Sequence, residues 1–272
     1  MDRDETRTHN SVERPDGRRI KMGVLQDKSA IVTGAGQGVG QGIALALAAE
    51  GAKVAVVDLN QDTAKDTVTQ IENRGGTATA IVCDIRDSAQ VDAAVLHTVD
   101  TFGGVDILVN NAMATKFGVP IEELTDEDIE LSYRTGPMAT AYFMRAAFPF
   151  LQGGGRVINI RSGSEVEGIV GFGAYVPAKA AVGGLTRTAA REWGRKGVNV
   201  NAVCPFVLSP AAKQYYATHP EELDWAMNQL SIPRDGDAEH DVGRAVVFLA
   251  GPDAGFVTGC TIMADGGGSF IG

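Results

Sequence analysis

The sequence predicts a single α/β domain built on a doubly wound, seven-stranded parallel sheet with helices on both faces. Two observations support this fold class. Short, almost continuously apolar segments alternate with longer segments of helical periodicity, a pattern typical of parallel strands joined by crossover helices. No change of composition and no Ser/Pro-rich linker interrupts residues 25–272, so one domain is favoured over two.

The predicted elements follow one another in strict alternation. The strands are the apolar segments at 28–33, 53–58, 77–84, 105–110, 156–160, 198–203 and 257–263. The helices are expected at 39–50, 62–74, 88–102, 125–151, 174–195 and 238–250. Right-handed crossovers place these helices on both faces of the sheet, and the functional site then lies at the carboxyl ends of the strands.

Two segments differ from this pattern. Residues 1–22 are polar, and we expect a disordered N-terminal extension before a catalytic domain at 23–272. A loop-and-helix excursion fills 204–236, and within it residues 206–232 resemble a variable substrate lid. Its large side chains favour an apolar or ring-bearing substrate, or else they pack the lid onto the domain: Tyr215, Tyr216, Trp225 and Met227.

Composition and charge exclude several function classes. The formal net charge of −10 argues against nucleic acid or an acidic membrane surface as a partner. No apolar segment is long enough to span a membrane, and the first residues lack the apolar region of a secretory signal. The three cysteines and four histidines show no disulfide or metal spacing, so no metal is expected. A cytoplasmic location is the simplest expectation.

A glycine-rich turn follows the first strand of the domain. Residues 33–40 read TGAGQGVG and lead from that strand into a helix, with glycines at Gly34, Gly36, Gly38 and Gly40. Such a turn lets backbone N–H groups approach a pyrophosphate at the amino end of a helix. Because strand, turn, helix and second strand occur in order, the sequence predicts a dinucleotide site here.

Two acidic residues end the second and third strands. Asp58, 24 residues after Gly34, is placed to bind the adenosine ribose hydroxyls. Its charge would repel a 2′-phosphate, and no Lys or Arg stands at 35–37 or 59–60 to compensate, so NAD is preferred over NADP. Asp84 could accept from the adenine amino group, or it could be a helix-capping or turn residue.

The expected chemistry depends on three residues. Tyr175 and Lys179 are four apart on a predicted helix and therefore share a face. A tyrosine that acts as a base near neutrality needs a pKa about three units below its ordinary value of about 10, and a nearby ammonium has the right sign of charge. Ser162, 13 residues before Tyr175, could hold a carbonyl oxygen while the tyrosine exchanges the proton.

With these motifs, residues 25–268 resemble the short-chain dehydrogenase/reductase family, which has a Rossmann fold. The resemblance rests on 33–40, the NNA at 110–112, the acids at strand ends, the Ser-Tyr-Lys set, Pro205 and a late Asp-Gly-Gly tail at 265–267. It implies cofactor contacts from Gln37, Val39, Asn111 and Pro205 besides the residues above. It also implies hydride transfer between nicotinamide and an alcohol or carbonyl carbon, usually in a homotetramer and sometimes in a dimer.

The chain departs from the family at four positions near the expected nicotinamide pocket. Met113 and Phe206 stand where glycines are usual, and Arg161 precedes the serine where a small residue is common. Tyr133 occupies the position of the family's catalytic asparagine. These changes indicate either neutral drift or a reshaped, bulkier substrate pocket. Arg161 and Lys116 could receive a substrate carboxylate or phosphate, although strand alternation should direct Arg161 away from Ser162.

Tyr133 raises a specific question about proton relay. In the family, the asparagine helps to hold a helix kink and a water that the lysine uses. Pro137 lies four residues after Tyr133 and has no N–H, so the Tyr133 carbonyl loses its usual helical donor. We hypothesise that this carbonyl stays free for a relay water; the alternative is that the proline only bends the helix.

The function expected from the sequence is therefore an NAD-dependent oxidoreductase that acts on an alcohol or ketone. A second possibility keeps the cofactor but changes the reaction, for example to C=C or C=N reduction, epimerisation or dehydration. A third is a catalytically silent NAD-binding regulator, against which the joint presence of Ser162, Tyr175 and Lys179 argues.

Overall fold

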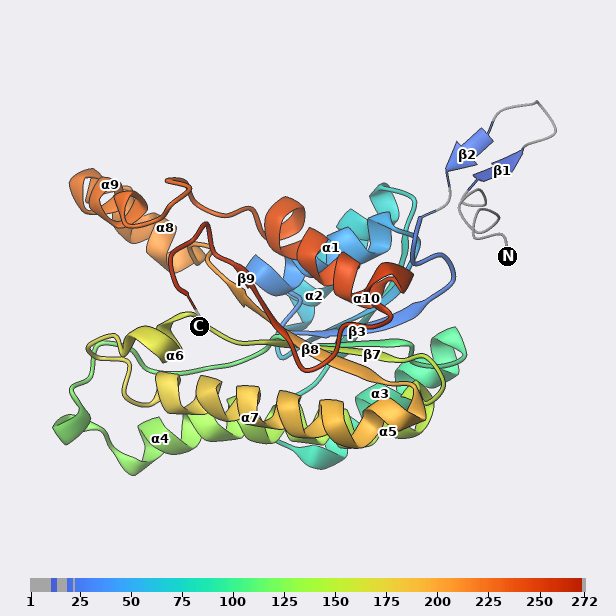
Figure 1. Ribbon diagram of the computed structural model, residues 1–272, viewed down its shortest axis with the longest axis horizontal. Coiled ribbons are helices and arrows are strands. Elements are labelled where there is room, and N and C mark those ends of the chain that lie inside the picture. Colours follow the sequence, from blue (N-terminus) through green and yellow to red (C-terminus); the bar gives the residue numbers. More distant parts are fainter. Residues whose placement is uncertain (1–10, 14–18, 22, 271–272) are drawn as a thin grey trace, which may run out of the picture.

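The computed structural model describes residues 11–13, 19–21 and 23–270 of the chain (Figure 1). Its central sheet has seven strands in the order β5-β4-β3-β6-β7-β8-β9, and all six ladders are parallel. The strands are β3 (Ser29–Thr33), β4 (Lys53–Asp58), β5 (Thr77–Val82), β6 (Ile107–Asn110), β7 (Arg156–Ile160), β8 (Asn199–Pro205) and β9 (Thr261–Ala264). The predicted fold class is confirmed.

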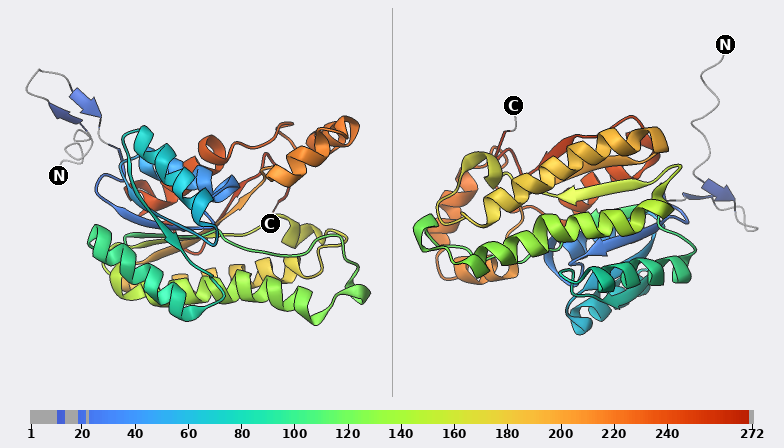
Figure 2. Two further views of the ribbon diagram at one scale, coloured as in Figure 1. Left: turned by 180° about the vertical axis from the view of Figure 1, so that it is seen from behind. Right: turned by 90° about the horizontal axis from the view of Figure 1, so that it is seen from below.

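Helices cover both faces of this sheet (Figures 1 and 2). One face carries α1 (Gly38–Ala49), α2 (Gln61–Asn73) and α10 (Arg244–Ala250). The other carries α3 (Ser88–Phe102), α5 (Ala139–Leu151) and α7 (Tyr175–Trp193). Beyond the sheet lie α4 (Asp126–Tyr133), α6 (Ser164–Glu167), α8 (Pro210–Tyr216) and α9 (Pro220–Asn228). The described residues also form three short 3₁₀ turns and a π-helical segment. The turns are η1 (Ile121–Glu123), η3 (Gly194–Lys196) and η5 (Pro252–Ala254), and the π-helical segment is η4 (Ala238–Gly243).

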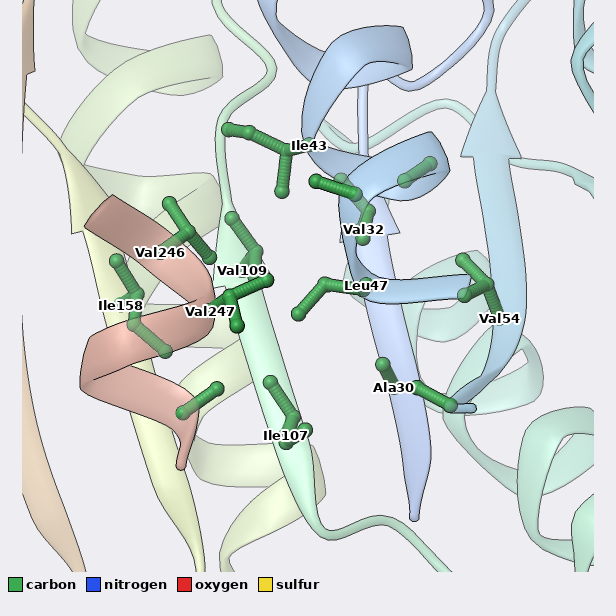
Figure 3. Packing of buried hydrophobic residues seen from close by; sticks show 14 of the residues in the cluster. Ala30, Val32, Ile43, Leu47, Val54, Ile107, Val109, Ile158, Val246 and Val247 are labelled. Atoms are coloured by element: carbon green, nitrogen blue, oxygen red, sulfur yellow. The ribbon is translucent and has the colours of Figure 1, made fainter. Parts of the chain in front are cut away.

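The central strand β3 shows why the sheet is buried on both sides. All five of its residues are buried, and successive side chains enter opposite cores. Ala30 and Val32 pack with Ile43 and Leu47 of α1 in the first core (Figure 3). Ile31 packs in the second core, among residues of α3 and α5. This arrangement explains the apolar character of the predicted strands.

The predicted helix at 125–151 is interrupted. Between α4 and α5 the structure has a π-helical turn, η2 (Arg134–Met138), with Pro137 inside it. Proline removes one N–H donor and its ring crowds the preceding turn, so a break in the regular pattern is expected there. The last strand also begins later than predicted, at Thr261 instead of residue 257, because Asn199 and Asn201 bind the carbonyl of Val257 in a loop.

The N-terminal prediction is tested only in part. Within 1–22 the structure describes two short strands, β1 (Ser11–Glu13) and β2 (Arg19–Lys21), which pair antiparallel. These two segments therefore differ from the expected disorder, and the remaining residues of 1–22 lie outside the described part of the chain. In the described ranges, no helix combines the length and apolar character needed to cross a membrane.

Candidate active site

A cavity of about 720 Å³ opens at the carboxyl ends of the strands, within the usual size range of ligand pockets. All the predicted cofactor residues except Gly40 line it: Gly34, Gln37, Gly38, Val39, Asp58, Asp84, Asn111, Tyr175, Lys179 and Pro205. These residues come from the turn after β3, the ends of β4 and β5, the end of β6, α7 and β8. The topology therefore brings together in one cavity what the sequence separates by up to 171 positions.

Backbone conformation or close packing requires glycine at three positions of the glycine-rich turn. Gly34 and Gly38 have φ angles of +62° and +59°, the left-handed region that favours glycine. Gly40 does not line the cavity, but a Cβ atom there would lie 2.2 Å from the carbonyl oxygen of Gly34. It allows α1 to start directly against the turn, which leaves the first N–H groups of that helix at the cavity.

Asp58 contacts the turn as well as the cavity. Its carboxylate accepts from the backbone N–H of Gly36 at 2.9 Å and from that of Asn60 at 3.0 Å. These two bonds hold Oδ2 toward the glycine turn and Oδ1 toward the start of α2. A carboxylate is thus fixed at the end of β4, where the sequence places the ribose contact.

Asp84 has a different role from the one expected. It forms a bidentate ion pair with Arg86, with an Nη2–Oδ2 distance of 2.6 Å, and this contact lowers the pKa of Asp84. Its Oδ1 also accepts from the Arg86 N–H, as in a turn. Asp84 still lines the cavity. Its turn contact is observed, and the contact with the adenine amino group stays a prediction.

Ser162, Tyr175 and Lys179 converge at the other end of the cavity. The Ser162 hydroxyl lies 2.7 Å from the Ser164 hydroxyl, and it is near enough to the Tyr175 phenol to lower the pKa of that phenol. Lys179 is buried, donates to the Ile160 carbonyl at 2.7 Å, and places its Nζ 5.7 Å from the centre of the Tyr175 ring. Ser162 is not itself among the lining residues, although its neighbours Ile160 and Arg161 are.

The pKa of Tyr175 differs in direction from the sequence expectation. Burial raises the pKa above its ordinary value, and the hydrogen bond from Ser162 opposes that rise without cancelling it. Burial also lowers the pKa of Lys179 to about 8. Both shifts have the same cause, because removing a charged group from water disfavours its charged form.

Three of the residues proposed for substrate binding need correction. The Arg161 guanidinium is paired with Glu165 and donates to Thr261 Oγ1 at 2.5 Å, so it is not available to a substrate anion although the residue borders the cavity. Lys116 pairs with Asp128 at 3.3 Å, outside the cavity. Phe206 lines a second, smaller cavity of about 370 Å³ instead. Met113 does line the main cavity, packed against Gly136.

Tyr133 does not replace the missing asparagine in the cavity. Its side chain is 37% exposed and is absent from the lining residues. The predicted loss of regular bonding after Tyr133 is observed, but a π-helical turn pairs each carbonyl with the N–H five residues on. For Tyr133 that donor is within the turn, at Met138, so the hypothesis of a free carbonyl is not supported.

Thr135 is a site residue that the sequence reasoning missed. Its hydroxyl accepts from the N–H of Ala114 at 3.0 Å and lies 2.8 Å from the carbonyl oxygen of the same residue. It is buried in the π-helical turn and lines the cavity beside Met113. The sequence shows only that a polar residue stands two positions after Tyr133. Its role depends on the π-helical turn η2, which brings the Thr135 hydroxyl to the backbone of Ala114.

An aromatic cluster around Tyr175 was also missed. The rings of Phe117 and Phe172 lie 4.6 Å apart, and each lies within 6 Å of the Tyr175 ring. Phe117 lines the cavity and is 53% exposed. Phe172 precedes Tyr175 by three residues, a helical spacing that could have indicated it, whereas Phe117 stands in a loop without periodicity.

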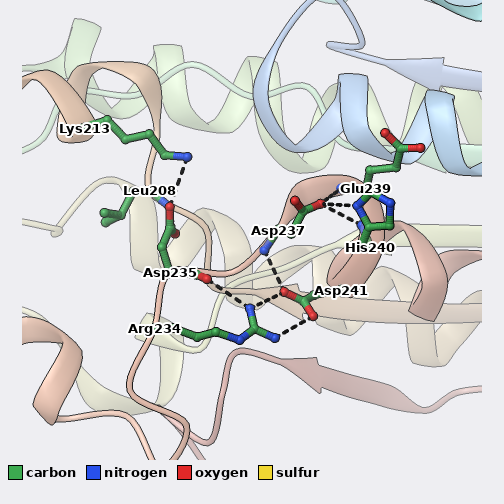
Figure 4. Close-up of polar contacts among 8 residues, drawn as sticks. All are labelled: Leu208, Lys213, Arg234, Asp235, Asp237, Glu239, His240 and Asp241. Carbon is green, nitrogen blue, oxygen red and sulfur yellow. Dashed lines mark hydrogen bonds and ion pairs between the residues drawn. The ribbon is translucent and has the colours of Figure 1, made fainter.

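The lid contributes less aromatic surface than expected. Its residues at the main cavity are Val207, Leu208 and Ser209, while Tyr216, Trp225 and Met227 do not line it. The side chain of Tyr215 lies outside the described part of the chain. Ion pairs anchor the lid (Figure 4): Asp235 accepts from the Leu208 N–H at 2.8 Å and pairs with Lys213 at 3.0 Å, and Arg234 binds Asp241.

Residues 34–269 match a family model described as enoyl-(acyl carrier protein) reductase. A 12alpha-hydroxysteroid dehydrogenase of a Clostridium species is 35% identical over 90% of this chain and 98% of that protein. Among solved structures, a dehydrogenase/reductase of Sinorhizobium meliloti is similar with a TM-score of 0.81, 34% identity, and coverage of 90% of this chain and 96% of that one.

A second similar structure is a short-chain dehydrogenase of Burkholderia cenocepacia in complex with NADP. Its TM-score is 0.82 at 34% identity, and the match covers 90% of this chain and 98% of that one. Relatives of this similarity are named dehydrogenases and reductases, which supports an oxidoreductase. The chain belongs to the short-chain dehydrogenase/reductase family.

Proposed function

We propose that the protein is an NAD-dependent dehydrogenase or reductase that interconverts an alcohol and a ketone. The observation that carries the proposal is the convergence of Ser162, Tyr175 and Lys179 at one end of a cavity whose other end carries the glycine turn and Asp58. A binding module has no use for the three residues together. The class of the relatives supports the same reaction.

Each of the three residues has a distinct task at the substrate oxygen. The bound nicotinamide ring supplies the hydride donor or acceptor. The Ser162 hydroxyl donates a hydrogen bond to the substrate oxygen, and the Tyr175 phenol exchanges the proton with it. The positive charge of Lys179, 5.7 Å from the ring centre, has the sign that favours the phenolate. The charge on an oxidised nicotinamide ring has that sign too, and it would help to lower a pKa that burial raises.

The preference for NAD rests on Asp58. A 2′-phosphate beside this fixed carboxylate would meet a like-charge repulsion on the order of several kcal/mol at a partly buried distance. Three basic residues line the cavity, and each already has a partner in the chain: Arg86 binds Asp84, Arg161 binds Glu165 and Lys179 binds a carbonyl. Among the residues that the structure describes, the cavity therefore offers a 2′-phosphate no uncommitted cation.

We also propose an apolar, ring-bearing substrate. The cavity is lined by Phe117, Met113 and Leu208, and the Phe117 ring lies 5.2 Å from that of Tyr175 and 4.6 Å from that of Phe172. Flat aromatic faces and a flexible thioether suit an alicyclic or aromatic ring more than a charged chain. The name of the hydroxysteroid dehydrogenase relative agrees with this substrate class.

The association state proposed is a homotetramer. Strand β9 ends the sheet, so one of its edges has no partner strand within the described chain. Phe256, in the segment that leads to β9, is fully exposed, and Phe248 of α10 is 43% exposed. An open sheet edge with exposed aromatic rings is a surface that a second copy of the chain could cover.

Turnover by the parent protein and by Tyr175→Phe tests the function. We expect the parent to reduce or oxidise a member of a panel of cyclic ketones and alcohols, with NAD(H) preferred over NADP(H). The variant should lose at least about a thousandfold in kcat yet bind NAD normally. Tight NAD binding without turnover on any alcohol or ketone would favour the silent regulator, and saturation of a C=C bond would favour the alternative reaction.

A further inference from the structure

Arg161 and Glu165 form a buried ion pair on either side of Ser162. Arg161 directly precedes the serine, and Glu165 lies three residues after it in α6. The two side chains are only 9% and 4% exposed. Withdrawing both charges from water is unfavourable, and the attraction between them offsets this only when the remaining polar atoms are satisfied.

This pair is not arranged for maximal stability. Arg161 Nε and Glu165 Oε2 are both buried with no hydrogen-bond partner among the described residues. A buried polar atom without a partner loses its hydrogen bonds to water and gains none in the fold, so each of the two destabilises the folded state. An apolar pair of similar volume would avoid that cost, so we look for what the charges achieve besides stability.

Arg161 connects the strand end that carries Ser162 to its neighbours. Its backbone N–H donates to the Val203 carbonyl of β8 at 2.9 Å. Its guanidinium donates to Thr261 Oγ1 of β9 at 2.5 Å and pairs with Glu165 in the turn after the serine. The Arg161 side chain therefore connects the end of β7 both to β9, on the far side of β8, and to the turn after Ser162.

The guanidinium also meets the helix that carries the other two residues of the site. Tyr175, Lys179 and Gly183 are spaced by four and share a face of α7. A Cβ atom at Gly183 would lie 2.6 Å from Arg161 Cζ. Helix α7 thus reaches the guanidinium only because Gly183 has no side chain, one turn beyond Lys179.

We propose that Arg161 and Glu165 are positioning residues, which hold the Ser162 hydroxyl against the Tyr175 phenol. Their ion pair closes the turn around Ser162, and the guanidinium seats this turn against α7. The role in turnover rests on the function proposed above. The geometric part does not, because the ion pair, the contact with Thr261 and the close approach at Gly183 belong to the chain itself.

The first test separates positioning from stability with a charge-neutral replacement. Arg161→Met and Glu165→Gln should each lower the midpoint of urea unfolding, because each leaves one buried charge alone. The double variant Arg161→Met/Glu165→Met should regain the parent's midpoint or exceed it. Its kcat should nevertheless stay about ten- to a hundredfold below the parent, with NAD affinity unchanged, as a misplaced reacting group predicts. A double variant with the parent's kcat would overturn the proposal.

The second test leaves both charged residues in place. Gly183→Ala should displace the guanidinium and lower kcat, whereas Gly184→Ala is a matched control because nothing lies within 4 Å of its new Cβ. Equal kcat values for the two alanine variants would contradict the proposal. This comparison remains decisive even if the double variant fails to fold.

A third measurement needs no turnover. The ionisation of Tyr175 can be followed by ultraviolet difference titration against Tyr175→Phe. Loss of the hydrogen bond from Ser162 should raise the pKa of Tyr175 in Gly183→Ala and in the double variant, because that bond lowers it in the parent. If the parent turns over no alcohol or ketone while this shift occurs, the function fails and the positioning stands. An unchanged titration overturns the positioning itself.

Discussion

Asp58 combines two duties in one carboxylate, since it accepts from the backbone N–H groups of Gly36 and Asn60 and also lines the cavity. Asp58→Asn keeps an oxygen acceptor but removes the charge. We expect the KM for NAD to rise about tenfold and the kcat/KM with NADP to increase, because the repulsion of a 2′-phosphate is lost.

Steady-state kinetics with both cofactors measure this effect. Asp62→Asn is the control, because Asp62 is exposed in the first turn of α2 and loses the same charge outside the cavity. If Asp58→Asn keeps the parent's ratio of NAD to NADP efficiency, Asp58 does not select the cofactor.

Lys179 gives a pH dependence of stability with a defined sign. Its pKa falls from 10.5 in the unfolded chain to about 8 in the folded one, so between these values the unfolded state binds more protons. The free energy of unfolding should therefore rise with pH across this window, by up to about 1.4 kcal/mol per pH unit, relative to Lys179→Met.

Urea unfolding of the protein without cofactor, from about pH 7 to about pH 9.5, measures this difference. A difference between parent and variant that stays constant over the range would show that Lys179 keeps its ordinary pKa in the fold.

At the residue scale, the sequence predicted positions better than orientations. Tyr175, Lys179 and Ser162 lie together as expected, because helical spacing and strand order fix where a backbone goes. The direction of the Arg161 side chain depends on Glu165, Gly183 and Thr261. Thr261 is 100 residues away in sequence, so no local pattern could reveal that contact.

At the scale of elements, one carboxylate just after the lid, that of Asp235, binds the lid at two points. Asp235 binds the Leu208 N–H, and Leu208 lines the cavity; the same carboxylate pairs with Lys213 of α8 (Figure 4). Asp235→Ala should loosen the lid, raise the KM of the substrate about tenfold and make 206–232 easier to cleave. The kcat should change less, because the reacting groups lie on other elements.

Limited proteolysis and initial-rate kinetics test this prediction together. Asp224→Ala serves as the control, because Asp224 is on α9 in the same lid and does not line the cavity. Asp235→Asn should be intermediate, since an amide oxygen still accepts from the Leu208 N–H while the ion pair with Lys213 is lost. Identical KM values and cleavage rates for parent and Asp235→Ala would rule out this anchoring role.

Elements were predicted well where periodicity is strong and poorly where it is local. The seven strands and the main helices follow from apolar runs that the two cores bury. The π-helical turn around Pro137 and the helix α6 were not predicted. The first depends on a single proline, and the second is only four residues long, too short for a periodic pattern. The interpretation of the lid as an aromatic cover for the substrate is not supported for Trp225, whose side chain remains largely exposed.

At the scale of the whole molecule, association can be tested at the open edge of the sheet. Phe256→Ser removes the fully exposed ring beside β9. We expect the parent to have the mass of four 28.5 kDa chains and the variant to shift toward smaller species. Light scattering after size-exclusion chromatography measures the masses.

Leu96→Ser is the matched control, because Leu96 is 53% exposed on α3, away from β9. A parent that elutes as a monomer, or a Phe256→Ser variant that stays tetrameric, would contradict the proposed surface. The sequence could not locate this surface, since exposure of a phenylalanine depends on which neighbours the fold supplies.

The strand order has a consequence for how such a protein can change over time. The first part of the chain, through α3, forms β3, β4 and β5 and carries the glycine turn and Asp58. The second part forms β6, β7, β8 and β9 and carries Tyr175. Between the strands the two parts meet along a single ladder, β3 with β6. A recombination event in the short loop at Gly103 and Gly104 could therefore exchange the reactive half as one unit while the nucleotide-binding half is inherited intact.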